Sequence, residues 1–303
     1  MKRHTKTTKK MNTPLQDEYG NSALHNAIVD ENMEELARLI AAKLDLNIKN
    51  KLNDTPLAVA ILLQNTTAAQ MLLNAGADCT IQDEQGYTPL HDVAGYGNVE
   101  LAQVLLQAGA LVTTVDEDQR TPLFHAIVGN HTDMVQVLLQ AGSQVNLADN
   151  MNKTPLHEAV MTDNPTMVQM ILDAGAEKEV ADINGYTPLH NAAGIGSAEI
   201  AQMLLQAGSQ VNALSKYQDT PLHIASSDDK ITIIKILLQA GALINAQDVD
   251  GMTPLHIALG AGFELVIKTL LSHGADVTIK DAQGRRPVDY AKNKFIKNIL
   301  LQS

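Results

Sequence analysis

Apolar and small residues recur along most of the chain with a period of 33 positions. A Thr-Pro-Leu tripeptide, or a close variant of it, places an apolar residue at the same point of every repeat, which we call the motif position. Because no insertion interrupts the count, we expect nine units of equal length that bury their apolar faces against one another in a solenoid. The motif residues are Leu24, Leu57, Leu90, Leu123, Leu156, Leu189, Leu222, Leu255 and Val288.

The pattern within each repeat predicts two helices followed by a loop. Thr directly before Pro is typical of a helix start, since the hydroxyl accepts a backbone N–H and proline suits the first helical position. A second helix follows with apolar residues at helical spacing, as at Leu101, Ala102, Leu105 and Leu106. A glycine then recurs with the same period and predicts a left-handed helix cap. These glycines are Gly76, Gly109, Gly142, Gly175, Gly208, Gly241 and Gly274.

The loop before each first helix has the pattern Asp-x-x-Gly, which predicts a tight turn. The fourth and seventh repeats have Gln119 and Gln218 in place of this glycine, so we expect their loops to be distorted locally. The first repeat has Lys43 where later repeats have the capping glycine, and the ninth has a Lys-rich second helix predicted over 294–301. These departures are typical of terminal capping repeats, whose outer face must be polar.

The 33-residue period with Thr-Pro-Leu-His-x-Ala, Leu-Leu-x-x-Gly-Ala and Asp-x-x-Gly closely resembles the ankyrin-repeat family. The resemblance covers residues 17–303. It implies an all-α repeat solenoid with short β-hairpin loops, an ankyrin-repeat stack with one concave side. We therefore expect one domain over 17–303, with the first and last repeats as caps, and a basic, disordered tail over 1–16.

Charge is unevenly distributed around the formal net value of −12. Residues 17–276 hold 11 basic and 32 acidic residues, whereas both ends of the chain are basic. A body this acidic repels phosphate backbones and attracts basic surfaces, so we expect a protein partner with a basic or mixed surface and no nucleic acid. The basic residues of the tail leave open a nuclear address, a phosphate or membrane contact, or simple solvation.

Cys79 is the only cysteine, which excludes an intrachain disulfide and a Cys-based zinc site. The basic start lacks the apolar segment of a signal peptide, and no run of about 18 apolar residues follows it. We therefore expect a cytoplasmic monomer without a membrane span, while a nuclear location or transfer into a host cell stays open.

Six of the ten histidines share the position directly after the motif residue. The family resemblance implies a structural role for them, since a buried imidazole needs hydrogen-bond partners and a metal site needs several ligands that converge. Gly-x-Gly runs such as 194–196 lack the third glycine and the preceding strand of a dinucleotide site. We expect no catalysis, cofactor or metal, and a histidine-based metal-dependent enzyme is the remote alternative. The histidines are His25, His91, His157, His190, His223 and His256.

The resemblance also implies a contact surface, because partners of ankyrin repeats usually touch the loop tips and the exposed end of the first helix. Tyr and Arg are enriched at binding hot spots, and apolar clusters within polar surroundings mark interfaces. Tyr directly after the loop glycine is nevertheless common in the family without a binding role. The candidate partner-binding residues are Tyr87, Tyr96, Arg120, Met151, Met161, Ile183, Tyr186, Ile195, Tyr217 and Met252.

We expect this surface to serve a non-catalytic scaffold that binds a partner protein through its concave face and hairpin tips. Two alternatives would use the same surface. One is an inhibitor or targeting subunit of an enzyme or transcription factor, and the other is a host-directed effector.

Overall fold

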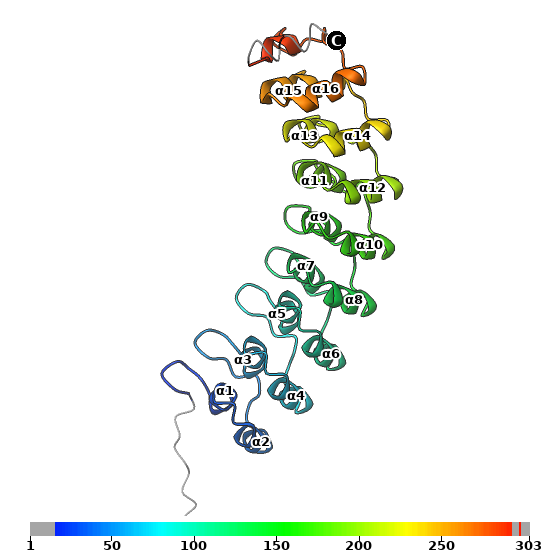
Figure 1. Cartoon of the computed structure of the whole chain (residues 1–303). Helices are drawn as coiled ribbons and strands as arrows, with labels where there is room; N and C mark the ends of the chain where they lie inside the picture. Colours follow the sequence, from blue (N-terminus) through cyan, green and yellow to red (C-terminus); the bar gives the residue numbers. More distant parts are fainter. Residues whose placement is uncertain (1–15, 293–296, 298–303) are drawn as a thin grey trace, which may run out of the picture. The chain divides into compact units, whose positions relative to one another are not determined.

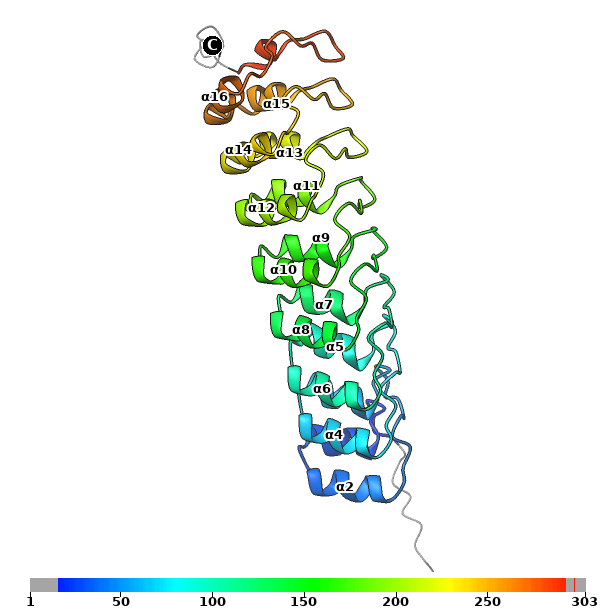
Figure 2. The ribbon, with the colours of Figure 1, turned by 90° about the vertical axis from the view of Figure 1, so that its right-hand side faces the viewer.

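The structure is a computed structural model that describes residues 16–292 and Lys297. Its helices come in pairs, and the described residues form turns but no β-strand between them (Figures 1 and 2), which confirms an all-α repeat fold. The helices are α1 (Ala23–Val29), α2 (Met33–Ala41), α3 (Pro56–Leu62), α4 (Thr66–Asn74), α5 (Pro89–Tyr96), α6 (Val99–Gln107), α7 (Pro122–Val128), α8 (Thr132–Gln140), α9 (Pro155–Met161), α10 (Pro165–Asp173), α11 (Pro188–Ile195), α12 (Ala198–Gln206), α13 (Pro221–Ser227), α14 (Ile231–Gln239), α15 (Pro254–Ala261), α16 (Glu264–Ser272) and the 3₁₀ helix η1 (Pro287–Tyr290).

The chain divides into two compact units. The N-terminal unit lies within Met1–Val93 and Asn98–Leu111, and the C-terminal unit within Ala94–Gly97 and Val112–Ser303. In the N-terminal unit α1 packs on α3, while α2, α4 and α6 pack in sequence. In the C-terminal unit the first helices α7, α9, α11, α13 and α15 form one row and the second helices α8, α10, α12, α14 and α16 form another. A single domain over 17–303 stays a prediction.

The helix ends follow the expected local chemistry. In α11, as in the other repeats with the full motif, Pro188 takes the first helical position and Thr187 precedes it in an extended conformation. The motif leucines of the first eight repeats are fully buried. The seven capping glycines have φ angles of 89–95°, and Lys43 enters the same left-handed region at φ 55°. Since a side chain there costs roughly 1–2 kcal/mol, the first repeat tolerates a strained cap at Lys43.

The repeat histidines connect successive repeats. Each Nδ1 accepts the backbone N–H of the Ser or Thr three residues earlier at 3.0–3.1 Å. With Nδ1 an acceptor, Nε2 carries the proton, and in five of the six it donates to a backbone carbonyl of the next repeat at 3.0–3.3 Å. Burial lowers the pKa of these five imidazoles, so they stay neutral. The predicted structural role is confirmed.

The loops before the first helices, which we call fingers, project from the same side within each unit (Figure 2). The expected distortion at Gln119 and Gln218 is wrong. Their φ angles of 63° and 60° lie in the same left-handed region as the glycine at position 86, at 79°. A polar side chain at the start of the finger holds the turn, because Asp116 Oδ1 accepts the N–H of Arg120 at 2.8 Å and Ser215 Oγ accepts that of Asp219 at 3.1 Å. The turn therefore survives without glycine.

Neighbouring fingers are joined by single backbone hydrogen bonds. The N–H groups of Ile183, Lys216 and Val249 each donate to a carbonyl of the preceding finger at 2.9 Å. One bond per pair of fingers does not make a ladder, which explains why the loops are turns rather than hairpin strands over residues 16–292.

The ninth repeat differs from the others in its first helix, which is the short 3₁₀ helix η1. The hydroxyl of Tyr290 donates to Asp281 Oδ2, and the Arg285 guanidinium lies 4.6 Å from the centroid of the Tyr290 ring. The predicted second helix over 294–301 lies outside the described residues except for Lys297. The basic tail over 1–16 likewise lies outside them except for Gln16.

Candidate partner-binding surface

The exposed candidate residues of the C-terminal unit lie on fingers and at the ends of first helices. Met151, Ile183 and Tyr217 stand on three successive fingers, and the side chain of Tyr217 is 51% exposed. Tyr96 ends α5 and Met161 ends α9, where the Met161 side chain is 48% exposed. An exposed apolar side chain gains free energy when a partner covers it, so these five residues are suited to contact.

The other candidates are half-buried. Tyr87 stacks on His91 with ring centroids 5.7 Å apart, and Tyr186 lies against His190 at 5.5 Å. Both tyrosines therefore also stabilise their own repeat. Ile195 at the end of α11 and Met252 on a finger are likewise half-buried, and the Met252 carbonyl accepts the His223 Nε2–H at 3.1 Å.

Arg120 is held by contacts inside the C-terminal unit. Its guanidinium carbon lies 5.5 Å from the centroid of the Phe124 ring, and its nitrogens lie 3.5 Å from Asp118 and 3.7 Å from Asp149. Phe124 occupies the place that histidine has in most repeats and is fully buried. Arg120 therefore covers a core aromatic ring, and only part of its side chain faces solvent.

Sequence reasoning missed four exposed apolar residues at the same helix-end positions. Val29, Leu62 and Val128 stand five residues after their motif leucines, and Leu63 stands six after. Each side chain is about half exposed. The repeat count could have identified them, since Met161 and Ile195 occupy the same two positions after their motif leucines.

A hollow with mainly apolar walls lies in the C-terminal unit between α9, α11 and α13. Its volume is about 330 Å³. We call it the apolar hollow. It brings together three of the predicted residues, Met161, Tyr186 and Ile195, with four that the sequence did not suggest. The lining residues are Met161, Tyr186, His190, Asn191, Gly194, Ile195 and Ile224.

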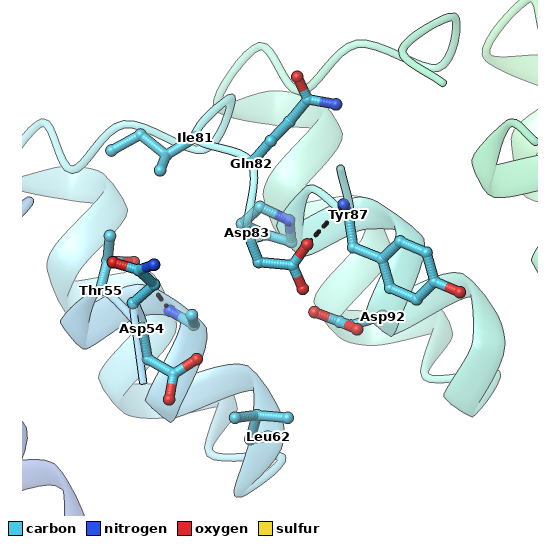
Figure 3. A pocket seen from close by; sticks show the side chains of 11 residues that line it. Asp54, Thr55, Leu62, Ile81, Gln82, Asp83, Tyr87 and Asp92 are labelled. Carbon is cyan, nitrogen blue, oxygen red and sulfur yellow. Dashed lines mark hydrogen bonds between the residues drawn. The ribbon is translucent and has the colours of Figure 1, made fainter. Parts of the chain in front are cut away.

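A smaller cavity of about 80 Å³ lies in the N-terminal unit between α3 and α5. Asp54, Asp83 and Asp92 direct their carboxyl groups into the same space, with Leu62 below them and Tyr87 beside Asp92 (Figure 3). We call it the acidic hollow. Asp83 Oδ1 accepts the backbone N–H of Tyr87 at 2.8 Å, so this carboxylate also holds its finger.

Burial and mutual repulsion set the charge of the acidic hollow. Burial first, and then the nearby carboxylates of Asp83 and Asp54, raises the pKa of Asp92 to about 7. Burial likewise raises the pKa of Asp54. Ionising all three groups together is therefore unfavourable, and a cation beside them would relieve the repulsion.

No group of three His, Cys, Asp or Glu residues within residues 16–292 and Lys297 has a geometry that could hold a metal ion. In five of the six repeat histidines both ring nitrogens are engaged in hydrogen bonds, Nδ1 within its own repeat and Nε2 with the next one. In the same part of the chain, no helix is both long and apolar enough to span a membrane.

Comparison with known proteins identifies the repeats. The sequence model described as "Ankyrin repeats (3 copies)" matches residues 6–83, 24–116, 90–182, 156–248 and 189–281. A comparison with curated proteins finds no match.

Two similar crystal structures are ankyrin repeat domains. The domain of Bcl-3, described as a unique member of the IkappaB protein family, is 30% identical, covers 72% of this chain and 100% of its own, and has a TM-score of 0.64. The domain of human ASB11 is 28% identical, covers 71% of this chain and 97% of its own, and has a TM-score of 0.65.

Proposed function

Because this chain belongs to the ankyrin-repeat family, we propose that it is a non-catalytic module that binds a partner protein with its fingers and the exposed ends of its first helices. The observation that carries the proposal is the exposure of large apolar side chains at equivalent positions of successive repeats, with Met151, Ile183 and Tyr217 on neighbouring fingers. A monomeric soluble protein rarely gathers such side chains unless a partner covers them.

The finger surface is ordered before it binds. Each finger turn is held by a side chain at its first position, as when Asp182 Oδ1 accepts the N–H groups of Asn184 and Tyr186 at 2.8 and 2.9 Å. Backbone hydrogen bonds between fingers and the histidine bonds between repeats fix their spacing. A rigid surface loses little conformational entropy on association, so modest contacts suffice for affinity.

Charge favours a basic partner. Residues 112–276 hold 19 acidic and seven basic residues, so the C-terminal unit is strongly negative. This field attracts a protein with a basic or mixed surface and disfavours a nucleic acid backbone.

The test compares capture by the full chain and by a double variant, Met151→Ala with Tyr217→Ala. Partners captured from a lysate are identified by mass spectrometry, purified and titrated against both proteins. We expect at least tenfold weaker binding by the variant, because truncating a buried anchor typically costs about 2 kcal/mol. The matched control, Gln136→Ala with Gln202→Ala, changes two exposed side chains of the second helices.

The control should bind like the unchanged protein. If both double variants lose affinity equally, the contact lies elsewhere. The same conclusion follows if Met151→Ala with Tyr217→Ala keeps full affinity. Thermal unfolding of all three proteins shows whether a loss reflects binding or folding.

A further inference from the structure

We propose that the apolar hollow binds one large apolar side chain of a partner protein, presented by a segment that carries Lys or Arg beside it. The inference rests on the proposed function and specifies the chemistry of the partner segment.

The sixth repeat places a glycine in the wall of the hollow, where the adjacent repeats have side chains. Gly194 stands five residues after its motif leucine, where the fifth repeat has Met161 and the seventh has Ser227. A Cβ atom at position 194 would lie 3.4 Å from Ile224 Cγ2, in van der Waals contact, so a side chain there would be directed toward another wall of the hollow. The volume of about 330 Å³ is at the lower end of the ~300–1,000 Å³ range of ligand pockets and suits one side chain rather than a large ligand.

The polar groups around the hollow suit a peptide. His190 is not available to hydrogen-bond a peptide, because its Nδ1 accepts the Thr187 N–H at 3.1 Å and its Nε2 donates to the Asp219 carbonyl at 3.0 Å. The side-chain amide of Asn191 and the hydroxyl of Tyr186 have no hydrogen-bond partner within residues 16–292. An amide at the edge of an apolar hollow can pair with the backbone of an incoming segment while the apolar side chain fills the space.

Acidic residues at the helix ends beside the hollow favour basic neighbours on that segment. Asp163 follows α9, and Asp228 and Asp229 follow α13, and all three are exposed. Lys230 pairs with Asp228 at 3.4 Å, and its side chain lies close to Gly196 at the end of α11. Asp163 and Asp229 form no ion pair within residues 16–292, so their charges are available to a Lys or Arg of the partner.

The hollow also continues the proposed contact surface. Met161 and Ile195 line it from the ends of α9 and α11, and Tyr186 lines it from a finger. The finger of Tyr186 carries exposed Ile183 and is bonded to the next finger, which carries Tyr217. A segment that lies across the fingers can therefore place one side chain in the hollow.

The test uses a phage-displayed library of random 12-residue peptides selected on the full chain. The enriched peptides are then synthesised and titrated against the unchanged protein and Gly194→Leu. We expect a shared apolar position with Lys or Arg within three residues, and at least tenfold weaker binding by Gly194→Leu because its side chain fills the hollow. The matched control is Gly95→Leu at the same repeat position of the third repeat, where a Cβ meets nothing within 4 Å.

A second variant, Asp229→Asn, tests the charge component without filling the hollow. It should weaken binding of the basic peptides severalfold and reduce the dependence of their affinity on salt. Gly194 lies in a helix at negative φ, so Gly194→Ala adds helix propensity and serves as a folded variant with a partly filled hollow. Its affinity should fall between those of the unchanged protein and Gly194→Leu.

The inference is overturned if no peptide is enriched, if the enriched peptides lack the apolar position with a basic neighbour, or if Gly194→Leu and Gly95→Leu bind them equally. The proposed function has a separate readout in the finger variant. If Met151→Ala with Tyr217→Ala loses the captured partner while Gly194→Leu keeps it, the binding module stands and the hollow is not its anchor site.

Discussion

The acidic hollow of the N-terminal unit and the apolar hollow of the C-terminal unit share three positions of the repeat and present opposite chemistry. Three pairs of lining residues stand 99 positions, or three repeats, apart: Leu62 and Met161, Tyr87 and Tyr186, and Asp92 and Asn191. The first two pairs conserve the size and apolar character of the side chain. The third exchanges a carboxyl group for an amide, and that exchange separates the two hollows.

One of the two charged neighbours of the exchanged residue also changes sign. Asp54, which repels Asp92 in the acidic hollow, corresponds after three repeats to Lys153, which lies 3.4 Å from Glu158. Asp83 corresponds to Asp182, so one of the two neighbouring carboxylates is retained. The repeat thus determines where a side chain stands, whereas its burial and then the carboxylates around it determine its charge state. Two substitutions can exchange the hollows and measure that difference.

The largest effect is expected from Asp92→Asn, which gives the acidic hollow the amide of the apolar one. The pKa of Asp92 is raised to about 7 in the folded protein, from about 3.9 in an unfolded chain. The folded state therefore binds the proton more tightly, and this group's contribution to stability is lost as the pH rises from about 4 through 7. At pH 8 we expect Asp92→Asn to raise the free energy of unfolding by about 2 kcal/mol, since partial exposure reduces the full effect of the shift.

Urea denaturation at pH 5 and pH 8 provides the measurement. The increase in the free energy of unfolding caused by Asp92→Asn should be markedly smaller at pH 5 than at pH 8. The difference between variant and unchanged protein isolates Asp92, because the buried histidines, with lowered pKa values, act in the opposite direction in both proteins. Glu100→Gln, at an exposed position of α6, controls for the loss of one negative charge. A gain of the same size at both pH values would show that Asp92 does not titrate in this range.

A smaller and opposite effect is expected from Asn191→Asp, which introduces the carboxyl group into the apolar hollow. Asn191 is half-buried, and only one of the two repelling carboxylates has an equivalent there. We expect a loss of about 1 kcal/mol at pH 8 and little change at pH 4, where the new group is protonated. NMR titration of the introduced carboxyl should give a pKa below that of Asp92. A higher value would mean that burial, rather than the neighbouring charges, dominates at this position.

The sequence predicted the repeat register because every helix start and cap depends on residues close in the chain. Pro188 after Thr187 and the capping glycines with left-handed φ are local signals, and the structure confirms them. The prediction of distorted loops at Gln119 and Gln218 was wrong for a reason that is also local. Aspartate or serine at the start of the finger holds the turn, and glycine is favourable there but not required.

The hollows could not be predicted in the same way, because their walls come from different repeats. The repeat count gave Met161, Tyr186 and Ile195 as contact residues, but it gave no reason to expect a cavity beside Gly194. The raised pKa of Asp92 likewise depends first on burial between repeats and then on the carboxylates of Asp83 and Asp54. Such properties arise from packing between repeats, which a pattern within one repeat does not contain.

The smallest effect concerns the finger turns beside the two hollows. Gln218, on the finger before α13, has φ 60°, and Asn53, on the finger before α3, has φ 65°. Glycine removes the left-handed strain of about 1 kcal/mol but makes the unfolded chain more flexible, so Gln218→Gly should stabilise the protein by only about 0.5 kcal/mol. Asn tolerates this conformation better than Gln, and the Asn53 side-chain amide also donates to Glu84 at 2.6 Å. Asn53→Gly should therefore not increase the stability measured by thermal unfolding. An increase equal to that of Gln218→Gly would show that the two turns store the same strain.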